Sequence, residues 1–265
     1  MTSKISFIVP CWNEREGIPH LLTALEETRR LVGPGYEWEF IFVDDGSSDG
    51  TAELLEVECL GGSDVRVIRH AVNRGLGAAL RTGFAQATGE LVVTNDSDCT
   101  FDPRELPAML RLLAQGADIV AASPYHPRGS VLNVPAYRLL LSRNLSRLYR
   151  WVLGTRLHSY TSLFRLYRGE VIKRVSFTSD DFLAVTQILV GALRAGYRVV
   201  EHPTRLSVRR YGASKARIPQ MILDHLGHLW QLICRRPDVA PRAGSLPPQA
   251  PEPEEPALKS GGGPR

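Results

Sequence analysis

Asp96 and Asp98 stand two positions apart in a short polar segment, residues 95–98. On an extended backbone, the side chains of residues i and i+2 point in the same direction. The two carboxylates could therefore hold one hard divalent cation, Mg²⁺ or Mn²⁺, because these ions prefer oxygen ligands. A metal ion there would neutralise a diphosphate group and help it to leave. An isolated pair of this kind is more often a polar turn and helix cap, so its interpretation depends on the rest of the chain.

A second acidic segment, residues 44–51, reads DDGSSDGT. Asp45, and with it Asp44, could accept hydrogen bonds from a nucleotide base or a ribose. The alternative is a turn followed by a helix N-cap, which serine and aspartate favour. Residues 10–14 could form the opposite wall of such a site, with Trp12 as a stacking surface, or could simply end a strand and cap a helix.

Residues 73–77, NRGLG, place Arg74 and two glycines directly ahead of a stretch with helical composition. Glycine lets a backbone approach a phosphate group closely, and the N-terminus of a helix attracts negative charge. The segment therefore suits contact with phosphate, although glycine spacing alone is weak support.

Apolar runs and helical patterns alternate through the first half of the chain. Strands are expected at residues 5–9, 40–43, 65–68, 90–94 and 117–122, and helices at residues 18–25, near 54–55, at 77–87 and at 103–113. This order predicts an α/β fold with a doubly wound, mainly parallel sheet flanked by helices. Ligands bind such sheets beyond the carboxyl ends of the strands. Three of the polar segments follow a strand directly, so we expect them to meet in one site.

The second half of the chain is less regular. Strands are expected at residues 164–167 and 198–200, and helices at residues 137–153, 181–195 and 218–234. The composition changes at Pro237, because eight of the 18 prolines lie between Pro237 and Pro264. Such a segment cannot build a hydrophobic core. We therefore expect one folded domain over residues 1–236 and a disordered tail over residues 237–265.

The composition narrows the class of protein. The chain has 265 residues, of which 43% are hydrophobic and 23% charged, with a formal net charge of +4. These values are ordinary for a folded soluble domain, and without a Lys/Arg-rich block a nucleic-acid partner is not expected. The four cysteines show no C-x-x-C spacing, and the N-terminus does not read as a signal peptide. No run approaches the roughly 20 apolar residues of a transmembrane helix, so a cytoplasmic location is expected.

Taken in order, these segments resemble family 2 glycosyltransferases of the GT-A fold. The resemblance is greatest to polyprenyl-phosphate sugar synthases of the dolichyl-phosphate mannose synthase type. The motifs P-x-Y/W-N-E, V-D-D-G-S-x-D-x-T, N-x-G-x-G-x-A and D-x-D match residues 9–14, 43–51, 73–79 and 96–98, and later segments at 161–165 and 209–215 resemble T-S-G-F-R and R-x-x-G-x-S-K. The resemblance implies inverting transfer of a hexose, with mannose favoured, to a polyprenyl or dolichyl phosphate. GDP-mannose or a UDP-hexose would be the donor, with Mg²⁺ or Mn²⁺ as the cofactor.

The same resemblance implies roles for individual residues. The metal ligands would be Asp96 and Asp98, and these two would act in catalysis with Arg138, Arg209 and Lys215. The donor, bound by residues 1–122, would contact Pro10, Trp12, Glu14, Asp44, Asp45, Arg74, Asp96 and Ser97. The acceptor phosphate, bound by residues 123–236, would contact Arg128, Arg138, Ser142, Arg209 and Lys215.

Four positions depart from the family pattern. Thr100 stands where a glutamine, a further metal ligand, is usual. Pro124 replaces the arginine of an S-R-Y segment, and Arg128 could substitute for it. Ser159 replaces an aspartate, and Leu163 replaces the glycine of T-S-G-F-R. These departures concern the acceptor more than the donor.

Two other functions stay open at this point. Transfer to the hydroxyl of a soluble sugar or natural product would need a general base, which Asp180, Asp181 or, further on, Gln187 could supply. A catalytically silent nucleotide-binding scaffold is the alternative from another class.

If the acceptor is a lipid, residues 137–153 and 218–234 could form interfacial helices for peripheral contact with the cytoplasmic membrane face. Their alternative role is plain packing onto the sheet.

Overall fold

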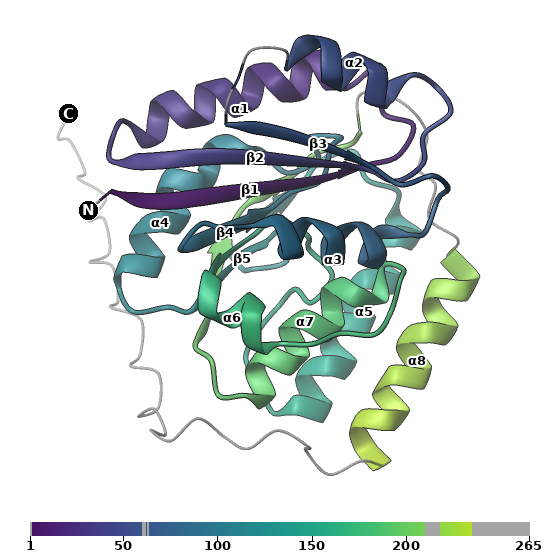
Figure 1. Ribbon diagram of the computed structural model, residues 1–265. Coiled ribbons are helices and arrows are strands. Elements are labelled where there is room, and N and C mark those ends of the chain that lie inside the picture. The colour runs from purple at the N-terminus through teal and green to yellow at the C-terminus, as the bar shows by residue number, and fades with distance from the viewer. Residues whose placement is uncertain (1, 60–61, 63, 210–217, 235–265) are drawn as a thin grey trace, which may run out of the picture.

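The computed structural model describes residues 2–59, 62, 64–209 and 218–234. Its centre is a seven-stranded sheet with helices on both faces (Figure 1). The strands follow the order β3 (Val65–Arg69), β2 (Tyr36–Asp44), β1 (Ser3–Cys11), β4 (Leu91–Thr94), β7 (Arg165–Arg168), β5 (Ile119–Ser123) and β8 (Val199–Pro203). Strand β7 runs antiparallel to its neighbours β4 and β5, and the other pairs are parallel. The prediction of a mainly parallel α/β sheet is confirmed.

The helices lie close to the expected positions. They are α1 (Ile18–Val32), α2 (Thr51–Glu58), α3 (Leu76–Gln86), α4 (Leu106–Ala114), α5 (Ala136–Leu153), α6 (Gly169–Arg174), α7 (Leu183–Arg194) and α8 (Ile218–Cys234). The sequence does not predict α6, or strands β6 (Ser130–Val131) and β9 (Arg205–Leu206), which pair with each other in a small second sheet. Elements of two to six residues are too short to show a hydrophobic period.

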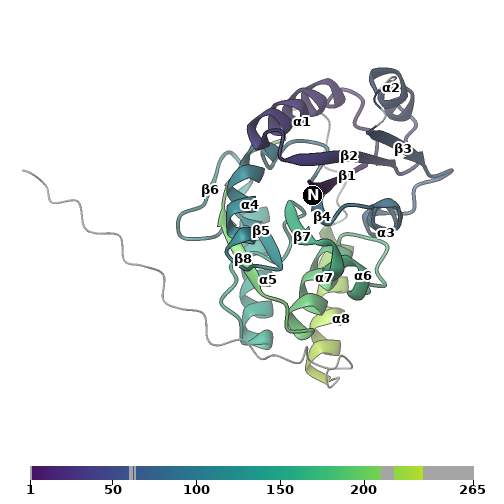
Figure 2. The same cartoon turned by 60° about the vertical axis from the view of Figure 1, so that its left-hand side comes forward.

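The sheet separates two hydrophobic layers, because successive side chains of a strand point to opposite faces. Phe7 and Val9 of β1 pack with residues of α1, α2 and α4. Ile8, between them, packs with residues of α3, α6 and α7 on the other face (Figure 2). Each of these three side chains is fully buried, which contributes about 1.5–3 kcal/mol per side chain to stability.

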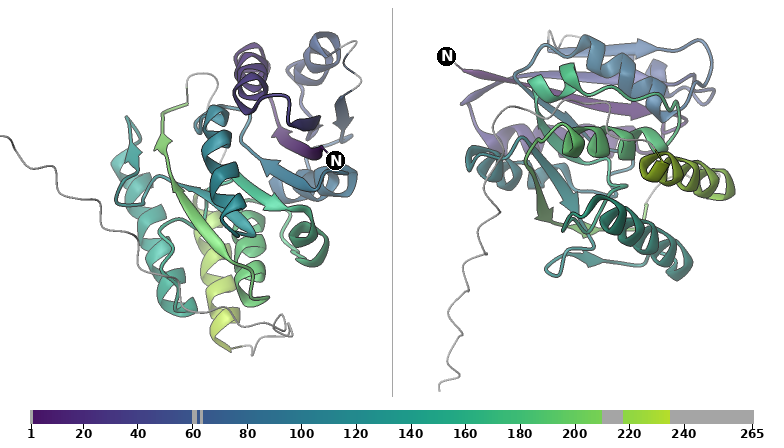
Figure 3. Two further views of the ribbon diagram at one scale, coloured as in Figure 1. Left: turned by 90° about the vertical axis from the view of Figure 1, so that its left-hand side faces the viewer. Right: turned by 90° about the horizontal axis from the view of Figure 1, so that it is seen from below.

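Helix α8 packs against α5 and α7 at one end of the molecule (Figure 3). Its buried face carries Leu229, Leu232 and His225, and the Nδ1 atom of His225 lies 3.0 Å from the hydroxyl of Tyr149 on α5. Within the part of the chain that the structure describes, no helix combines the length and the apolar character needed to cross a membrane.

The strand register aligns the carboxyl ends of three neighbouring strands. Cys11, the last residue of β1, lies opposite Asp44, the last residue of β2. Asp44 in turn lies opposite Arg69 at the end of β3. Strand β4 runs parallel to β1 on its other side, and residues 95–98 follow it directly. The loops that carry the polar segments therefore leave the sheet at the same edge.

Candidate active site

An acidic cluster lies at this edge of the sheet around the guanidinium group of Arg209. The Nε atom of Arg209 donates to Asp98 Oδ2 at 3.0 Å, and a terminal nitrogen donates to Glu14 Oε1 at 2.5 Å. Glu14 follows β1 and is 7% exposed, whereas Arg209 follows β9. The backbone N–H of Thr100 donates to the other oxygen of Asp98 at 3.0 Å. The fold thus joins residues from opposite ends of the described chain.

Asp96 shares this negatively charged environment. Burial and the neighbouring Asp98 carboxylate, with a smaller effect from Glu14, raise the pKa of Asp96 well above its usual range, although Arg209 acts in the opposite direction. Among the described residues, three carboxylates thus lie near one guanidinium, an arrangement in which a divalent cation would offset negative charge.

The chemistry of this donor set fits Mg²⁺ or Mn²⁺, because the ligands are all oxygens. Among the described residues, no group of three or more His, Cys, Asp or Glu side chains is placed to hold a metal ion. If Asp96 and Asp98 hold the ion, oxygens of a ligand would complete its coordination. A diphosphate supplies such oxygens.

The two aspartates at the end of β2 differ in their surroundings. Asp44 is fully buried; its Oδ2 atom accepts from the backbone N–H of Ser47 at 3.1 Å, and its Oδ1 atom has no hydrogen-bond partner among the described residues. Asp45 is bonded on both oxygens: Oδ1 accepts from the N–H of Arg74 at 3.0 Å, and Oδ2 from the N–H of Gly75 at 2.7 Å. Asp45 therefore positions the loop before α3, and its contact with a base or ribose stays a prediction.

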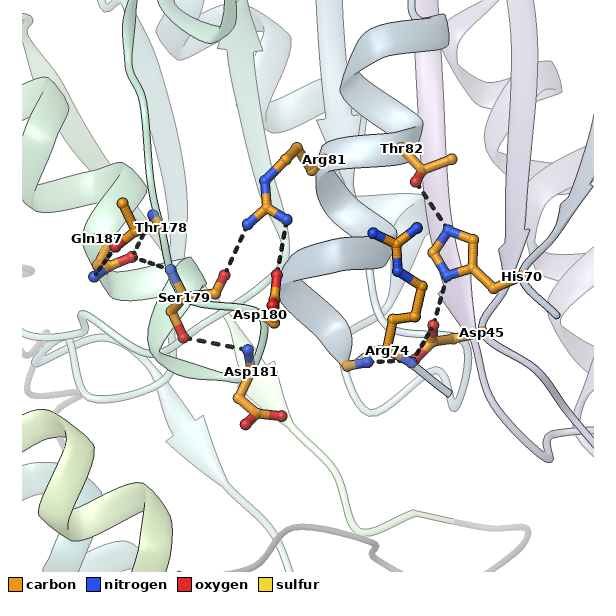
Figure 4. A network of polar contacts seen from close by, with 11 residues as sticks. Asp45, His70, Arg74, Arg81, Thr82, Thr178, Ser179, Asp180, Asp181 and Gln187 are labelled. Carbon is orange, nitrogen blue, oxygen red and sulfur yellow. Dashed lines mark hydrogen bonds and ion pairs between the residues drawn. The ribbon is translucent and has the colours of Figure 1, made fainter. Parts of the chain in front are cut away.

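His70 is a member of this site that sequence reasoning missed. Its Nδ1 atom lies 2.6 Å from Asp45 Oδ1, and its Nε2 atom lies 2.9 Å from the hydroxyl of Thr82 on α3 (Figure 4). His70 follows β3 directly, so the rule that pointed to the other polar segments also applied to it.

Residues 10–14 form a wall tied to the acidic loop after β2. The backbone N–H of Asn13 donates to Ser47 Oγ, and that of Glu14 donates to Thr51 Oγ1, both at 2.8 Å. Trp12, beside them, is 36% exposed and offers an aromatic surface at this edge. The structure therefore brings together the donor-side residues predicted from the sequence, and their individual roles in donor binding remain predictions.

The acceptor-side residues are described less completely. The hydroxyl of Ser142 on α5 lies 3.1 Å from that of Thr161. Arg128 is exposed, and its backbone N–H donates to His126 Nδ1 at 3.2 Å. Arg138 belongs to α5, but its side chain, like Lys215 as a whole, lies outside the described part of the structure. Contacts of these residues with an acceptor phosphate stay predictions.

The candidate bases lie in the loop before α7, beside the start of α3 (Figure 4). Asp180 is engaged: Arg81 donates to its Oδ1 atom at 2.8 Å, and its backbone carbonyl accepts from the N–H of Gly77 at 2.6 Å. The Asp181 carboxylate forms no ion pair with any described residue. It lies beside Gly75, where an added Cβ atom would come within 2.9 Å of Asp181 Oδ1. Within the described residues, Arg81 therefore engages Asp180 and not Asp181, and the role of either carboxylate as a base stays a prediction.

Gln187, the third candidate, has a structural role. Its Oε1 atom accepts from the backbone N–H groups of Thr178 and Ser179 at 3.0 and 2.9 Å (Figure 4). It holds the loop that presents Asp180 and Asp181.

Comparison with known proteins assigns the site to a family. Residues 6–176 match the family model described as glycosyl transferase family 2. The chain belongs to this family, and it is a glycosyltransferase. It is 32% identical over 221 residues to polyprenol monophosphomannose synthase of Mycolicibacterium smegmatis, covering 81% of each chain. It is 31% identical over 232 residues to dolichol-phosphate mannosyltransferase of Pyrococcus furiosus, covering 87% of this chain and 64% of that one.

Solved structures agree on the fold. The chain is similar to glucosyl-3-phosphoglycerate synthase from Mycobacterium tuberculosis bound to uridine diphosphate, with a TM-score of 0.63, 21% identity, and coverage of 87% of this chain and 80% of that one. It is also similar to the same enzyme bound to Mn²⁺ and UDP-glucose, with a TM-score of 0.63, 20% identity, and coverage of 88% and 79%. The GT-A architecture expected from the motifs is confirmed.

Proposed function

We propose that this glycosyltransferase moves a hexose, with mannose favoured, from a nucleoside-diphosphate sugar to a polyprenyl phosphate, with inversion at the anomeric carbon. The observation that carries the proposal is the acidic cluster of Glu14, Asp96 and Asp98 around Arg209, at the edge where the loops expected to bind the nucleotide meet. The relatives named for transfer of mannose to polyprenol and dolichol phosphates support this acceptor class. These names favour mannose as the sugar, and GDP-mannose is the donor that we expect ahead of a UDP-hexose.

The donor end of the reaction requires neutralisation of the departing diphosphate. Asp96 and Asp98 would hold Mg²⁺ or Mn²⁺, which when bound offsets negative charge on the nucleoside diphosphate. The relative solved with Mn²⁺ and UDP-glucose supports this cofactor. Arg209 lies within hydrogen-bond distance of Asp98 and adds a guanidinium, a group that binds phosphate oxygens through paired N–H donors.

A lipid phosphate acceptor needs little help from a base, because it is already anionic near neutral pH. The polar groups expected to orient it are Arg128, Arg138, Ser142, Arg209 and Lys215. Of these, Ser142 lies against Thr161 in the segment that resembles T-S-G-F-R. This position supports a role for Ser142 in holding the acceptor.

Transfer to a hydroxyl is the second candidate, and it is favoured by Asp181, whose carboxylate forms no ion pair with a described residue. A carboxylate at this position could accept a proton from a sugar or natural-product hydroxyl. Asp180 serves as its matched control, because Arg81 already engages it. Asp181→Asn should abolish transfer to a hydroxyl but leave transfer to a lipid phosphate intact.

The test is a donor screen with the purified protein, Mn²⁺ or Mg²⁺ and a short polyprenyl phosphate, reading nucleoside diphosphate release. The proposal expects release that requires both metal and lipid phosphate, is lost in Asp98→Asn, and persists in Asp181→Asn and Asp180→Asn. Release that occurs only with hydroxyl acceptors and is lost in Asp181→Asn would replace the proposal with the second candidate.

A lipid acceptor also requires contact with a membrane surface, and we place the protein peripherally at its cytoplasmic face. Exposed apolar side chains on α5 and α8, among them Trp151 at 79% and Trp230 at 68% exposure, support this placement. Tryptophan is enriched where proteins meet the membrane interface.

A further inference from the structure

A cavity of about 320 Å³ lies beside α5 and shares no lining residue with the acidic cluster. Its lining residues are Tyr125, Arg143, Arg147, Arg150 and His158. At about 30 Å³ per water molecule, the volume holds roughly ten waters, enough for a phosphodiester with its ester groups. The donor chemistry described above uses none of these residues.

The three arginines form one face of α5. Positions i, i+4 and i+7 lie above one another on a helix, so Arg143, Arg147 and Arg150 present their guanidinium groups together. The guanidinium carbon of Arg143 lies 5.3 Å from the centre of the Tyr125 ring, and Arg150 Nε donates to the carbonyl of Leu157 at 3.0 Å. Within the described residues, none of the three arginines forms an ion pair with a carboxylate. Among the described residues, the three guanidinium groups therefore bring positive charge to the cavity that no carboxylate pairs with directly.

His158 adds a polar edge to the same cavity. Its Nδ1 atom lies 2.7 Å from Glu201 Oε2, and Glu201 Oε1 accepts from the backbone N–H groups of His158 and Ser159 at 2.8 and 2.9 Å. The Glu201 carboxylate is thus occupied in orienting the imidazole and does not pair with the arginines. An anion with several oxygens matches these donors, because arginine binds phosphate through paired N–H groups.

The surroundings of the cavity indicate where this anion comes from. Leu140, Leu148 and Trp151, at 60%, 44% and 79% exposure, form the neighbouring face of α5. Helix α8, packed beside α5, exposes a stripe of its own: Leu223, Leu226, Trp230 and Ile233. A small soluble phosphate would not need such apolar surfaces, whereas a bilayer presents phosphate headgroups directly above its hydrocarbon.

We propose that this cavity is a headgroup site that binds the phosphate of an anionic phospholipid while the apolar side chains of α5 and α8 enter the lipid. The cavity borders the proposed acceptor site, because Ser142 hydrogen-bonds to Tyr125, but none of the residues expected to hold the acceptor phosphate is among its lining residues. The inference rests on the membrane contact in the proposed function. It adds a specific lipid site to that contact and does not depend on which sugar is transferred.

The test measures binding of the full chain to vesicles of phosphatidylcholine alone and to vesicles that also contain phosphatidylglycerol. The variant Arg143→Ala/Arg147→Ala is compared with Arg30→Ala/Arg111→Ala, which removes the same charge from exposed positions on α1 and α4. An arginine near an anionic surface contributes about 1 kcal/mol, so the first variant should bind phosphatidylglycerol vesicles about thirtyfold more weakly. The control should lose no more than a small part of its binding.

The variant Arg143→Lys/Arg147→Lys separates a built site from diffuse charge. It keeps the charge but loses the planar fork, so a headgroup site predicts weaker binding, whereas diffuse attraction predicts wild-type binding and would overturn the proposal. Equal losses in the two alanine variants would also overturn it. A third contrary result combines two measurements. Free glycerol 3-phosphate binds tightly in calorimetry and needs Arg143 and Arg147, while the protein shows no preference for anionic vesicles. This result would assign the cavity to a soluble phosphate compound. Transfer to a short acceptor phosphate in solution should be unchanged in all these variants, so failure of that reaction in the wild type counts against the proposed function alone.

Discussion

Replacing His225 by asparagine should make the free energy of unfolding less dependent on pH between about pH 7.5 and 5. His225 is 1% exposed on α8, where its Nδ1 atom lies 3.0 Å from the hydroxyl of Tyr149. Burial, with a smaller contribution from His228, lowers the pKa of His225 from 6.5 to about 4, and Asp224 acts in the opposite direction. The contact between α8 and α5 therefore requires the neutral imidazole.

The direction and the size of this pH effect on the free energy of unfolding follow from the linkage between protonation and folding. Because the pKa is lower in the folded state, the unfolded chain binds the proton first as the pH falls. The stability that His225 contributes is complete above pH 6.5 and declines as the pH falls toward about 4. With about 1.4 kcal/mol per pKa unit, the loss is about 2 kcal/mol at pH 5 and approaches about 3 kcal/mol below pH 4.

The assay is urea unfolding of wild type and His225→Asn at several pH values in this range. The wild type should lose about 2 kcal/mol more than the variant on going from pH 7.5 to 5. His20→Asn, on α1 and remote from this contact, should behave like the wild type. Hydrogen exchange should locate the acid-sensitive opening in α8. Equal pH dependence in wild type and His225→Asn would refute the reasoning.

The remaining predictions concern the metal site and the packing of the core. Asp98→Asn should weaken Mn²⁺-dependent binding of GDP or UDP at least tenfold by calorimetry, since it removes one of two metal-binding carboxylates; unchanged metal-dependent binding would contradict the assignment. Gly77→Ala should lower stability by about 1–3 kcal/mol in thermal unfolding, because its Cβ would lie 2.2 Å from the carbonyl of Ser179. Gly227→Ala is the control: beyond its own helix and chain neighbours, its Cβ meets no described atom within 4 Å, so it should be neutral or stabilising. Arg165→Lys should cost about 1–3 kcal/mol in urea unfolding, because a lysine cannot satisfy both backbone carbonyls that this fully buried guanidinium reaches.

The sequence predicts much of the fold because its signals are local. A fully buried strand such as β1 appears as an apolar run, and a helix such as α1 as apolar residues three and four positions apart. The order of these elements implies a parallel sheet, and a parallel sheet places its strand-end loops together. The nearness of Asp44, Asp45 and Asp96 was therefore predictable without coordinates. His70 obeyed the same rule.

The pairings within the site depend on contacts that no local pattern encodes. The ion pair between Glu14 and Arg209 forms across 195 positions of the chain. The sequence could not show that Asp181 lacks an ion-pair partner among the described residues while Arg81 engages Asp180.

The carboxylate pair Asp96 and Asp98 shows what the local sequence contributes to the site and what the tertiary structure contributes. Its residue types, spacing and place after a strand were enough to predict a site for a divalent metal ion and a diphosphate. The raised pKa of Asp96 comes first from burial, which folding imposes, and then from the Asp98 carboxylate two residues away, with a smaller effect from Glu14, which folding brings close. The sequence by itself determined which groups are present and at which edge of the sheet they lie. The tertiary structure alone decided which of these groups form ion pairs and which are buried. The reason is that hydrogen bonding and burial depend on distances in space rather than on separation along the chain.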